Sequence, residues 1–291
     1  MEAVVLYFED EQAAAQRFAS ALGVPSQQVQ RHRFPDGELK LTLPTIGSAQ
    51  CYVYRSLFNP NEKLIELLFV AQTLRQQGRI DLTLVCPYLA YMRQDIAFHE
   101  GEVVSQKVVG QFLATLFDGV ITVDPHLHRI AHLEEAVNVA RPIAVSAAPL
   151  LGEYIAQRIP NAFLLGPDGE SAQWVAQAAA AHKLDHAACQ KVRYGDKHVE
   201  IELPDCDVKG RQVVLIDDVA SSGRTLAKAA QLVLAQGALS VDVAVTHALF
   251  ADDALAVIKA HGVGQVWSTD CIAHESNVIS IAPTLAQALQ A

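Results

Sequence analysis

Two adjacent carboxylates end an apolar run in the second half of the chain. Asp217 and Asp218 directly follow residues 213–216 (VVLI), and a turn rich in Ser, Gly and Thr comes next. Acids at the carboxyl end of a buried strand lie where ligands bind in open α/β sheets. Backbone N–H groups and hydroxyls at the start of a helix form an anion site. The segment therefore predicts a site for a phosphorylated sugar; a capped helix beside two solvated acids is the plainer alternative.

Basic side chains elsewhere in the chain suit a polyphosphate. Lys191 and Arg193 lie in the long polar stretch 190–210, and Arg93 follows a strand pattern that ends near Cys86. Lysine supplies a mobile point charge, whereas arginine presents a planar fork to phosphate oxygens. A loop that carries both can close over phosphates and exclude water. The alternatives for residues 190–210 are a solvated loop and an ordinary hairpin, and a hairpin is compatible with the functional interpretation.

A histidine next to a strand end is a candidate metal contact. His126 comes two residues after Asp124, which follows the apolar run 120–123. A neutral imidazole with a nearby carboxylate can ligate or orient a divalent metal. A histidine that is only hydrogen-bonded remains the alternative.

Predicted strands and helices, which must position these residues, alternate along the chain. Continuous apolar runs are typical of strands buried on both faces of a parallel sheet, and helical periodicity separates them, so the pattern predicts a doubly wound α/β fold. Pro142 and the small residues that follow it indicate a boundary between domains 1–145 and 146–291. The strand runs are 4–7, 51–54, 82–85, 120–123, 163–165, 213–216 and 241–245, and the helices are 62–77, 103–117, 172–182 and 225–236.

Composition excludes several classes of protein. Hydrophobic residues make up 51% and charged residues 19% of 291 residues, which excludes a disordered chain or a coiled coil. The net charge of −10 argues against a nucleic-acid surface but not against a small phosphorylated ligand. No apolar run is long enough for a membrane span, and the N-terminus resembles a first strand rather than a signal peptide. The five cysteines contain no CxxC motif, which favours free thiols in the cytoplasm.

Several segments, in order over nearly the whole chain, resemble the ribose-phosphate pyrophosphokinase (phosphoribosyl pyrophosphate synthase) family. Residues 213–226 resemble the phosphoribosyl-binding loop of the type I phosphoribosyltransferase-like fold. The other segments resemble the family's RFxDGE, PYxxYxRQD, DxH and PD motifs and its catalytic-loop Lys and Arg. They are 33–38 (RFPDGE), 59–62 (NPNE), 86–95 (CPYLAYMRQD), 122–126 (TVDPH), 166–168 (GPD) and 191–193 (KVR).

The resemblance implies a fold and an activity. The fold is α/β, with two tandem type I phosphoribosyltransferase-like domains, each a mostly parallel sheet flanked by helices. The final helix, residues 282–290, would return to the first domain. The activity is transfer of the pyrophosphoryl group of ATP to the C1 hydroxyl of ribose 5-phosphate, which gives phosphoribosyl pyrophosphate and AMP for nucleotide biosynthesis. The enzyme would be a homo-oligomer with its ATP site near a subunit interface.

The resemblance also implies roles for individual residues. Lys191 and Arg193 would be catalytic, with Mg²⁺ held by His126 and Asp168. Asp217 and Asp218 would hold the ribose, and the 5-phosphate would be held by Ser221, Ser222, Gly223, Arg224 and Thr225. ATP would be held by Phe34, which stacks on adenine, by Asp36 and Glu38, which accept from its amino group, and by Arg93 and Gln94. Asp95 is expected to orient Arg93.

Two departures from the family's motifs keep an alternative open. Many members have an acid where Ser221 stands, and Arg224 replaces a common glycine. These changes motivate a non-catalytic regulatory homologue that binds the same ligands or partner subunits, although the retained Lys191 and Arg193 argue against it. A phosphoribosyltransferase is disfavoured, because a lone transferase domain needs neither RFPDGE nor YMRQD. Residues 96–105 lack the long basic stretch of regulated bacterial members and resemble the shorter archaeal type.

Overall fold

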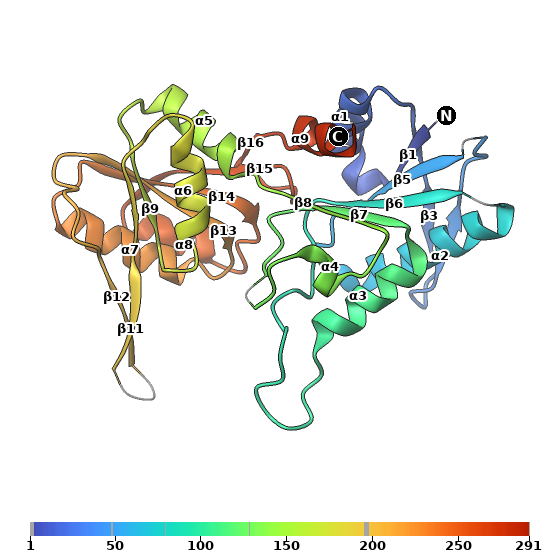
Figure 1. Ribbon diagram of the computed structural model, residues 1–291, viewed down its shortest axis with the longest axis horizontal. Coiled ribbons are helices and arrows are strands. Elements are labelled where there is room, and N and C mark those ends of the chain that lie inside the picture. Colours follow the sequence, from blue (N-terminus) through green and yellow to red (C-terminus); the bar gives the residue numbers. More distant parts are fainter. Residues whose placement is uncertain (1–2, 48, 79, 128, 195–197, 291) are drawn as a thin grey trace. The chain divides into compact units, whose positions relative to one another are not determined.

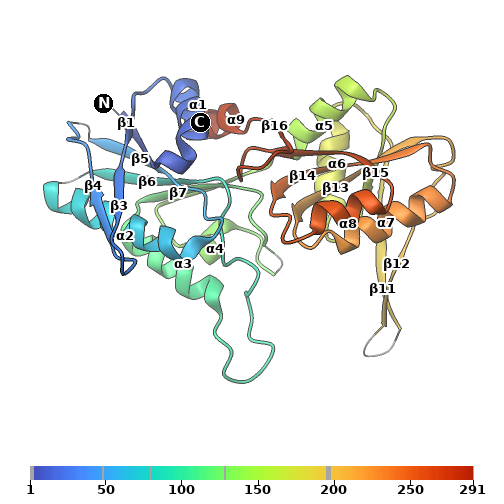
Figure 2. The same cartoon turned by 180° about the vertical axis from the view of Figure 1, so that it is seen from behind.

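The computed structural model divides into two compact units. The first unit comprises residues 1–145 together with residues 281–291, and the second comprises residues 146–280. The structure describes the chain except residues 1–2, 48, 79, 128, 195–197 and 291, and it describes only the backbone of residues 191–194 and 198–200. Both units appear in Figure 1 and, from behind, in Figure 2.

A six-stranded, entirely parallel sheet forms the centre of the first unit, in the order β2-β1-β5-β6-β7-β8. Its central strands are apolar and almost completely buried, as expected for strands covered on both faces. Helices α2 and α3 cover one face and α1 covers the other (Figures 1 and 2). The strands are β1 (Ala3–Tyr7), β2 (Ser26–Gln28), β5 (Gln50–Tyr54), β6 (Asp81–Cys86), β7 (Gly119–Val123) and β8 (Arg141–Val145). The helices are η1 (Glu9–Glu11), α1 (Gln12–Leu22), α2 (Pro60–Gln77), α3 (Ser105–Leu116), α4 (Leu133–Ala136) and α9 (Ala282–Gln290), and α9 packs against α1.

The second unit repeats this architecture in the order β10-β9-β13-β14-β15-β16, again all parallel. Helices α5 and α6 lie on one face of the sheet, and α7 and α8 lie on the other (Figures 1 and 2). The strands are β9 (Phe163–Gly166), β10 (His186–Ala188), β13 (Gln212–Ala220), β14 (Ser240–Ala248), β15 (Val263–Thr269) and β16 (Asn277–Ile279). The helices are α5 (Ala148–Arg158), α6 (Ala172–Ala180), α7 (Arg224–Ala235) and α8 (Ala254–Ala260).

Alternate residues of β13 divide between two hydrophobic cores. Val213 and Leu215 belong to the core that contains α7 and α8. Val214 and Ile216 belong to the core that contains α5 and α6. The strand is therefore apolar at every one of these positions, because successive side chains point to opposite faces and both faces are covered. The predicted α/β architecture is confirmed.

Each unit carries an antiparallel hairpin between its second strand along the chain and the next strand of the sheet. In the first unit, β3 (Gln30–Arg33) pairs with β4 (Leu39–Thr42). In the second unit, β11 (Gln190–Tyr194) pairs with β12 (His198–Glu202). Of the alternatives for residues 190–210, the structure therefore contains the hairpin.

Strand β13 extends well beyond its expected end. The sequence predicts a strand that ends at the acid pair, but β13 continues to Ala220 because β14 runs alongside it, with Ala220 opposite Ala248. In the part of the chain that the structure describes, no helix is both long enough and apolar enough to span a membrane.

Candidate active site

The acid pair of β13 carries a surplus of negative charge. The backbone N–H of Asp218 donates to Oδ1 of Asp217 at 3.0 Å, and Asp218 is buried. Desolvation, together with the negative charges of Asp218 and Asp168, raises the pKa of Asp217 well above its usual range. Three carboxylates therefore share one edge of the sheet, where a cation or donor hydroxyls would relieve their repulsion.

Asp168 reaches this edge from the neighbouring strand. It follows β9, which pairs with β13. Its Oδ1 accepts the backbone N–H groups of Glu170 at 3.1 Å and Ser171 at 3.3 Å, while the Ser171 hydroxyl donates to the Asp168 carbonyl at 2.6 Å. These bonds hold the turn and fix one oxygen of the carboxylate.

The turn after β13 depends on one glycine. Gly223 has φ +69°, and a Cβ there would lie 3.0 Å from both the Ala254 carbonyl oxygen and Ile258 Cγ2. Both the left-handed backbone and the contact with α8 therefore favour glycine. Helix α7 starts at the next residue, so its first N–H groups lie at the turn. Ser222 and Arg224 are exposed, and Ser221 and Thr225 are half-buried, which leaves the turn accessible to an anion.

The loop after β6 presents Arg93 and Gln94 in the first unit. Arg93 is exposed. Gln94 donates its side-chain amide to the Ile96 carbonyl at 3.0 Å and accepts the Gln106 N–H at its own carbonyl at 3.2 Å. The preceding Tyr91 has φ +65° and donates its hydroxyl to Asn61 of α2. Left-handed backbone at a non-glycine residue is a sparsely populated conformation that is enriched at functional sites.

Asp95 has a different partner from the expected one. Arg129 Nη1 donates to Asp95 Oδ1 at 2.6 Å, and the Asp95 side chain is 2% exposed. The Arg129 guanidinium also lies 5.7 Å from the centre of the Phe98 ring. The expectation that Asp95 orients Arg93 is therefore wrong for the described residues, because the chain turns after β7 and brings Arg129 to this carboxylate. Arg129 carries one sequence signal: it follows the same strand end as His126.

His126 lies at the end of β7 and is half-buried. Asp124, two residues earlier, has φ +35° and donates its N–H to the Val145 carbonyl at 2.9 Å. Among the described residues, no group of three or more His, Cys, Asp or Glu side chains is arranged to hold a metal ion.

The tip of the β3–β4 hairpin carries the candidate adenine contacts. Phe34 is 40% exposed and meets His32 edge-to-face with ring centres 4.8 Å apart. Asp36 and Glu38 are exposed, and Asp36 Oδ1 accepts the Glu38 N–H at 3.2 Å. The tip therefore offers a ring face and carboxylates in a turn.

The candidate residues thus divide between the two units. Those expected to hold ribose 5-phosphate gather at the edge of β13 in the second unit. Those expected to hold ATP lie in two places of the first unit: the hairpin tip and the loop after β6. His126 belongs to the first unit and Asp168 to the second. Lys191 and Arg193 lie on β11, and their side chains are outside the described part of the chain.

Comparisons with known proteins cover almost the whole chain. The model for the N-terminal domain of ribose phosphate pyrophosphokinase matches residues 3–116, and the phosphoribosyl transferase domain model matches residues 136–270. A ribose-phosphate pyrophosphokinase of Methanopyrus kandleri is 32% identical over 290 residues, which are 99% of this chain and 98% of that protein. Ribose-phosphate pyrophosphokinase 2 of Archaeoglobus fulgidus is 34% identical over 279 residues, 94% of this chain and 95% of that protein.

A solved structure shares the fold. Phosphoribosylpyrophosphate synthetase from Mycobacterium smegmatis aligns with a TM-score of 0.82 at 22% identity, covering 100% of this chain and 98% of that one. The expected phosphoribosyltransferase-like fold is therefore confirmed.

Proposed function

The chain belongs to the ribose-phosphate pyrophosphokinase family. From this premise we propose that it is a diphosphotransferase, with its ATP contacts in the first unit and its ribose 5-phosphate contacts in the second. ATP and ribose 5-phosphate are the substrates, and phosphoribosyl pyrophosphate and AMP are the products. The observation that carries the proposal is the acid pair near the carboxyl end of β13, which only Val219 and Ala220 separate from the open turn that leads into α7.

The second unit holds ribose 5-phosphate. Asp217 and Asp218 accept hydrogen bonds from the ribose hydroxyls. The turn from Ser221 to Thr225 takes the 5-phosphate, because its N–H groups and hydroxyls donate and the helix dipole favours an anion. The sugar is thereby fixed at two ends, which orients its C1 hydroxyl for in-line attack.

The chemical step needs no protein nucleophile. The C1 oxygen of the sugar attacks the β-phosphorus of ATP, the bond from that phosphorus to the α,β-bridging oxygen breaks, and AMP leaves while the hydroxyl proton passes to solvent or a nearby base. Charge builds up on the phosphate oxygens during transfer. We assign its stabilisation to Arg93, Lys191 and Arg193, as the family's motifs imply.

Magnesium fits the residues present. Asp217, Asp218 and Asp168 offer hard oxygen donors, and the charges of the last two add to desolvation in raising the pKa of Asp217, so a hard cation would relieve their repulsion. Magnesium at phosphate sites keeps several waters and uses few protein ligands. Asp168 and His126 are the proposed contacts, and the ion would neutralise phosphate charge.

Location and assembly also belong to this proposal. The five cysteines, none of which forms a disulfide, fit a cytoplasmic enzyme. Homo-oligomerisation, with the ATP site near a subunit interface, is proposed from the family resemblance. Light scattering coupled to size-exclusion chromatography measures the subunit number.

Product formation tests the function directly. The purified chain is incubated with ATP, ribose 5-phosphate and Mg²⁺, and AMP and phosphoribosyl pyrophosphate are quantified by chromatography. Equimolar formation of the two products is expected. Turnover no faster than that of a Lys191→Ala control would leave only ligand binding and contradict the enzymatic assignment.

A further inference from the structure

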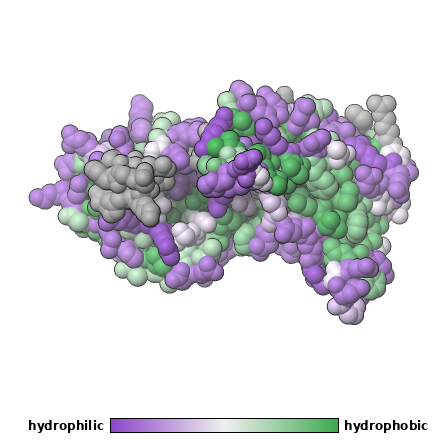
Figure 3. Space-filling view, turned by 90° about the horizontal axis from the view of Figure 1, so that it is seen from below, coloured by the Kyte–Doolittle hydropathy of each residue, from purple (hydrophilic) through white to green (hydrophobic). Residues whose placement is uncertain are grey.

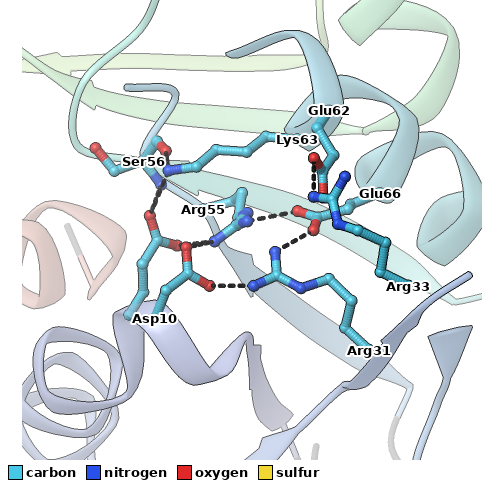
Figure 4. Close-up of polar contacts among 9 residues, drawn as sticks. Asp10, Arg31, Arg33, Arg55, Ser56, Glu62, Lys63 and Glu66 are labelled. Carbon is cyan, nitrogen blue, oxygen red and sulfur yellow. Dashed lines mark hydrogen bonds and ion pairs between the residues drawn. The ribbon is translucent and has the colours of Figure 1, made fainter. Parts of the chain in front are cut away.

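A second charged centre lies in the first unit and contains none of the residues assigned to the reaction. It gathers at the carboxyl ends of β1 and β5, and side chains from η1, β3 and α2 converge on it (Figure 4). We call it the charge cluster. Its members are Asp10, Glu11, Arg31, Arg55, Lys63 and Glu66.

The charge cluster occupies the position in the first unit's sheet that corresponds to the position of the acid pair in the second unit's sheet. Arg55 is as far from Gln50, the start of β5, as Asp217 is from Gln212, the start of β13, and the two strands have equivalent neighbours in their sheets. Arg55 is 1% exposed and donates to Asp10 at 2.8 Å. The cluster contains three cationic and three anionic side chains, so its own carboxylates already neutralise its cations. The equivalent position in the first unit therefore carries a charge-balanced cluster in place of an acid pair.

Glu66 joins the cluster to the β3–β4 hairpin. Its side chain is completely buried on α2. Oε2 accepts from Arg55 Nη2 at 2.5 Å, and Oε1 accepts from Arg31 Nη1 at 2.6 Å. Arg31 also lies 3.6 Å from Asp10. The positive charges around Asp10, chiefly that of Arg55, outweigh desolvation and lower its pKa, so the carboxylate stays ionised and keeps attracting Arg31.

The hairpin needs such an anchor. It has only two strands, and every residue of β3 is exposed, whereas isolated two-stranded hairpins are marginally stable. On β4, Leu41 packs against the hydrophobic core. On β3, ion pairs hold the side chains to α2: Arg31 pairs with Glu66, and Arg33 pairs with Glu62 one turn away on the same helix. Phe34 follows Arg33 directly, so these pairs set where the hairpin tip lies.

We propose that Arg31 is a positioning residue for the nucleotide: the charge cluster fixes its guanidinium, and through it β3, so that Phe34 and the carboxylates of the tip meet adenine. The inference rests on the proposed function. Arg31 itself touches neither substrate. Its loss would weaken ATP binding while leaving the ribose 5-phosphate site in the second unit unaltered.

Arg31→Gln is the variant to test, because Arg31 is 31% exposed and its removal leaves Glu66 paired with Arg55. Replacing Glu66 would instead leave Arg55 buried beside fewer counter-charges and endanger folding. Lys40→Gln is the matched control, since Lys40 is an exposed cation on β4 of the same hairpin. Arg31→Lys tests rescue by a residue that keeps the charge.

Two measurements report on the proposal. Calorimetry gives the Kd of α,β-methylene-ATP, in which the bond to be broken is replaced, and steady-state kinetics gives KM for each substrate. Arg31→Gln is expected to raise the Kd and the KM for ATP about tenfold, equivalent to about 1.4 kcal/mol, with KM for ribose 5-phosphate and the melting temperature nearly unchanged. Arg31→Lys recovers part of the loss, and Lys40→Gln matches the wild type.

Other results overturn the positioning role. These are an unchanged Kd for the analogue, a rise shared equally by Lys40→Gln, or equal changes in KM for both substrates together with a lower melting temperature. If the wild type itself forms no phosphoribosyl pyrophosphate but binds the analogue, the proposed function fails, and the Kd comparison still decides the role of Arg31. If the wild type binds no analogue, both proposals fail.

Discussion

Arg129 and Asp95 form an ion pair of 2.6 Å that joins the loop after β6 to the loop after β7. The arginine is 48% exposed, and the carboxylate it meets is 2% exposed. Because Asp95 follows Arg93 and Gln94, and Arg129 follows His126, the pair links proposed nucleotide contacts to a proposed metal contact within the first unit. It also holds Phe98 near the guanidinium.

Replacement of Arg129 is expected to lower both the melting temperature and the affinity for ATP. In Arg129→Gln the buried carboxylate loses its partner, at a cost of about 2 kcal/mol, below that of breaking a fully buried pair. Differential scanning calorimetry measures the fall in melting temperature, and kinetics a rise in KM for ATP. The double variant Arg129→Gln with Asp95→Asn should recover part of the stability, since no unpaired charge remains. Strictly additive losses would show that the two side chains are not coupled.

Asp217 is expected to lower the stability of the folded protein at neutral pH, although it contributes to ribose binding. Its pKa is raised in the folded protein, so the folded chain binds a proton more readily than the unfolded chain. The stability contribution of this group is therefore greatest below its usual pKa of about 4 and is lost as pH rises through the folded-state value. At pH 7.5 without Mg²⁺, Asp217→Asn should raise the melting temperature by about 3 °C, for about 1 kcal/mol. Glu153→Gln, which removes an exposed acid from α5, should not.

The same acid pair should decide sugar affinity. Asp217→Asn combined with Asp218→Asn is expected to weaken ribose 5-phosphate by at least tenfold while altering ATP affinity little, because the acids accept only from the ribose hydroxyls in the proposed complex. Titration calorimetry with each substrate alone makes the comparison. A similar loss for both ligands would refute the ribose assignment.

Lys191 is expected to act in the transition state. Lys191→Ala should lower kcat by orders of magnitude and leave the Kd for ATP nearly unaltered, since closure of a basic loop mainly stabilises the charge that develops during transfer. Single-turnover kinetics separates this step from product release. An unaltered kcat would remove Lys191 from the mechanism.

Phe34 is expected to contribute stacking energy to adenine binding. An exposed ring that stacks on a base is worth about 1 to 3 kcal/mol, so Phe34→Ala should raise KM for ATP by roughly tenfold, whereas Phe34→Trp should retain it. Phe69→Ala provides a control, because Phe69 is a similarly exposed ring on α2 that has no proposed ligand. Figure 3 shows other hydrophobic residues on the same unit's surface, so ring exposure alone does not identify a base site. Equal effects of both alanine variants would contradict the role of Phe34.

Local patterns were sufficient to predict seven strands, four helices and the order of the motifs, whereas strands β2, β8, β15 and β16 and helices α1, α5 and α8 were not predicted. The helix expected at residues 62–77 is α2 (Pro60–Gln77), and the apolar run at 213–216 lies in β13. Both could be recognised because the pattern of apolar residues within a single segment indicates how that segment is buried. The acid pair and the turn before α7 could likewise be recognised, since their chemistry is contained in consecutive residues.

The sequence by itself determined these elements, the β13 acid pair and the family, because each depends on residues that are neighbours along the chain. Only the tertiary structure decided the partners of Arg31, Arg55 and Arg129. Glu66 is 35 residues from Arg31, and Asp95 is 34 residues from Arg129. The type of a charged residue does not indicate which distant carboxylate it will pair with. Those pairs arise when strand order brings the ends of separate strands to one edge of a sheet, where burial then makes an unpaired charge costly.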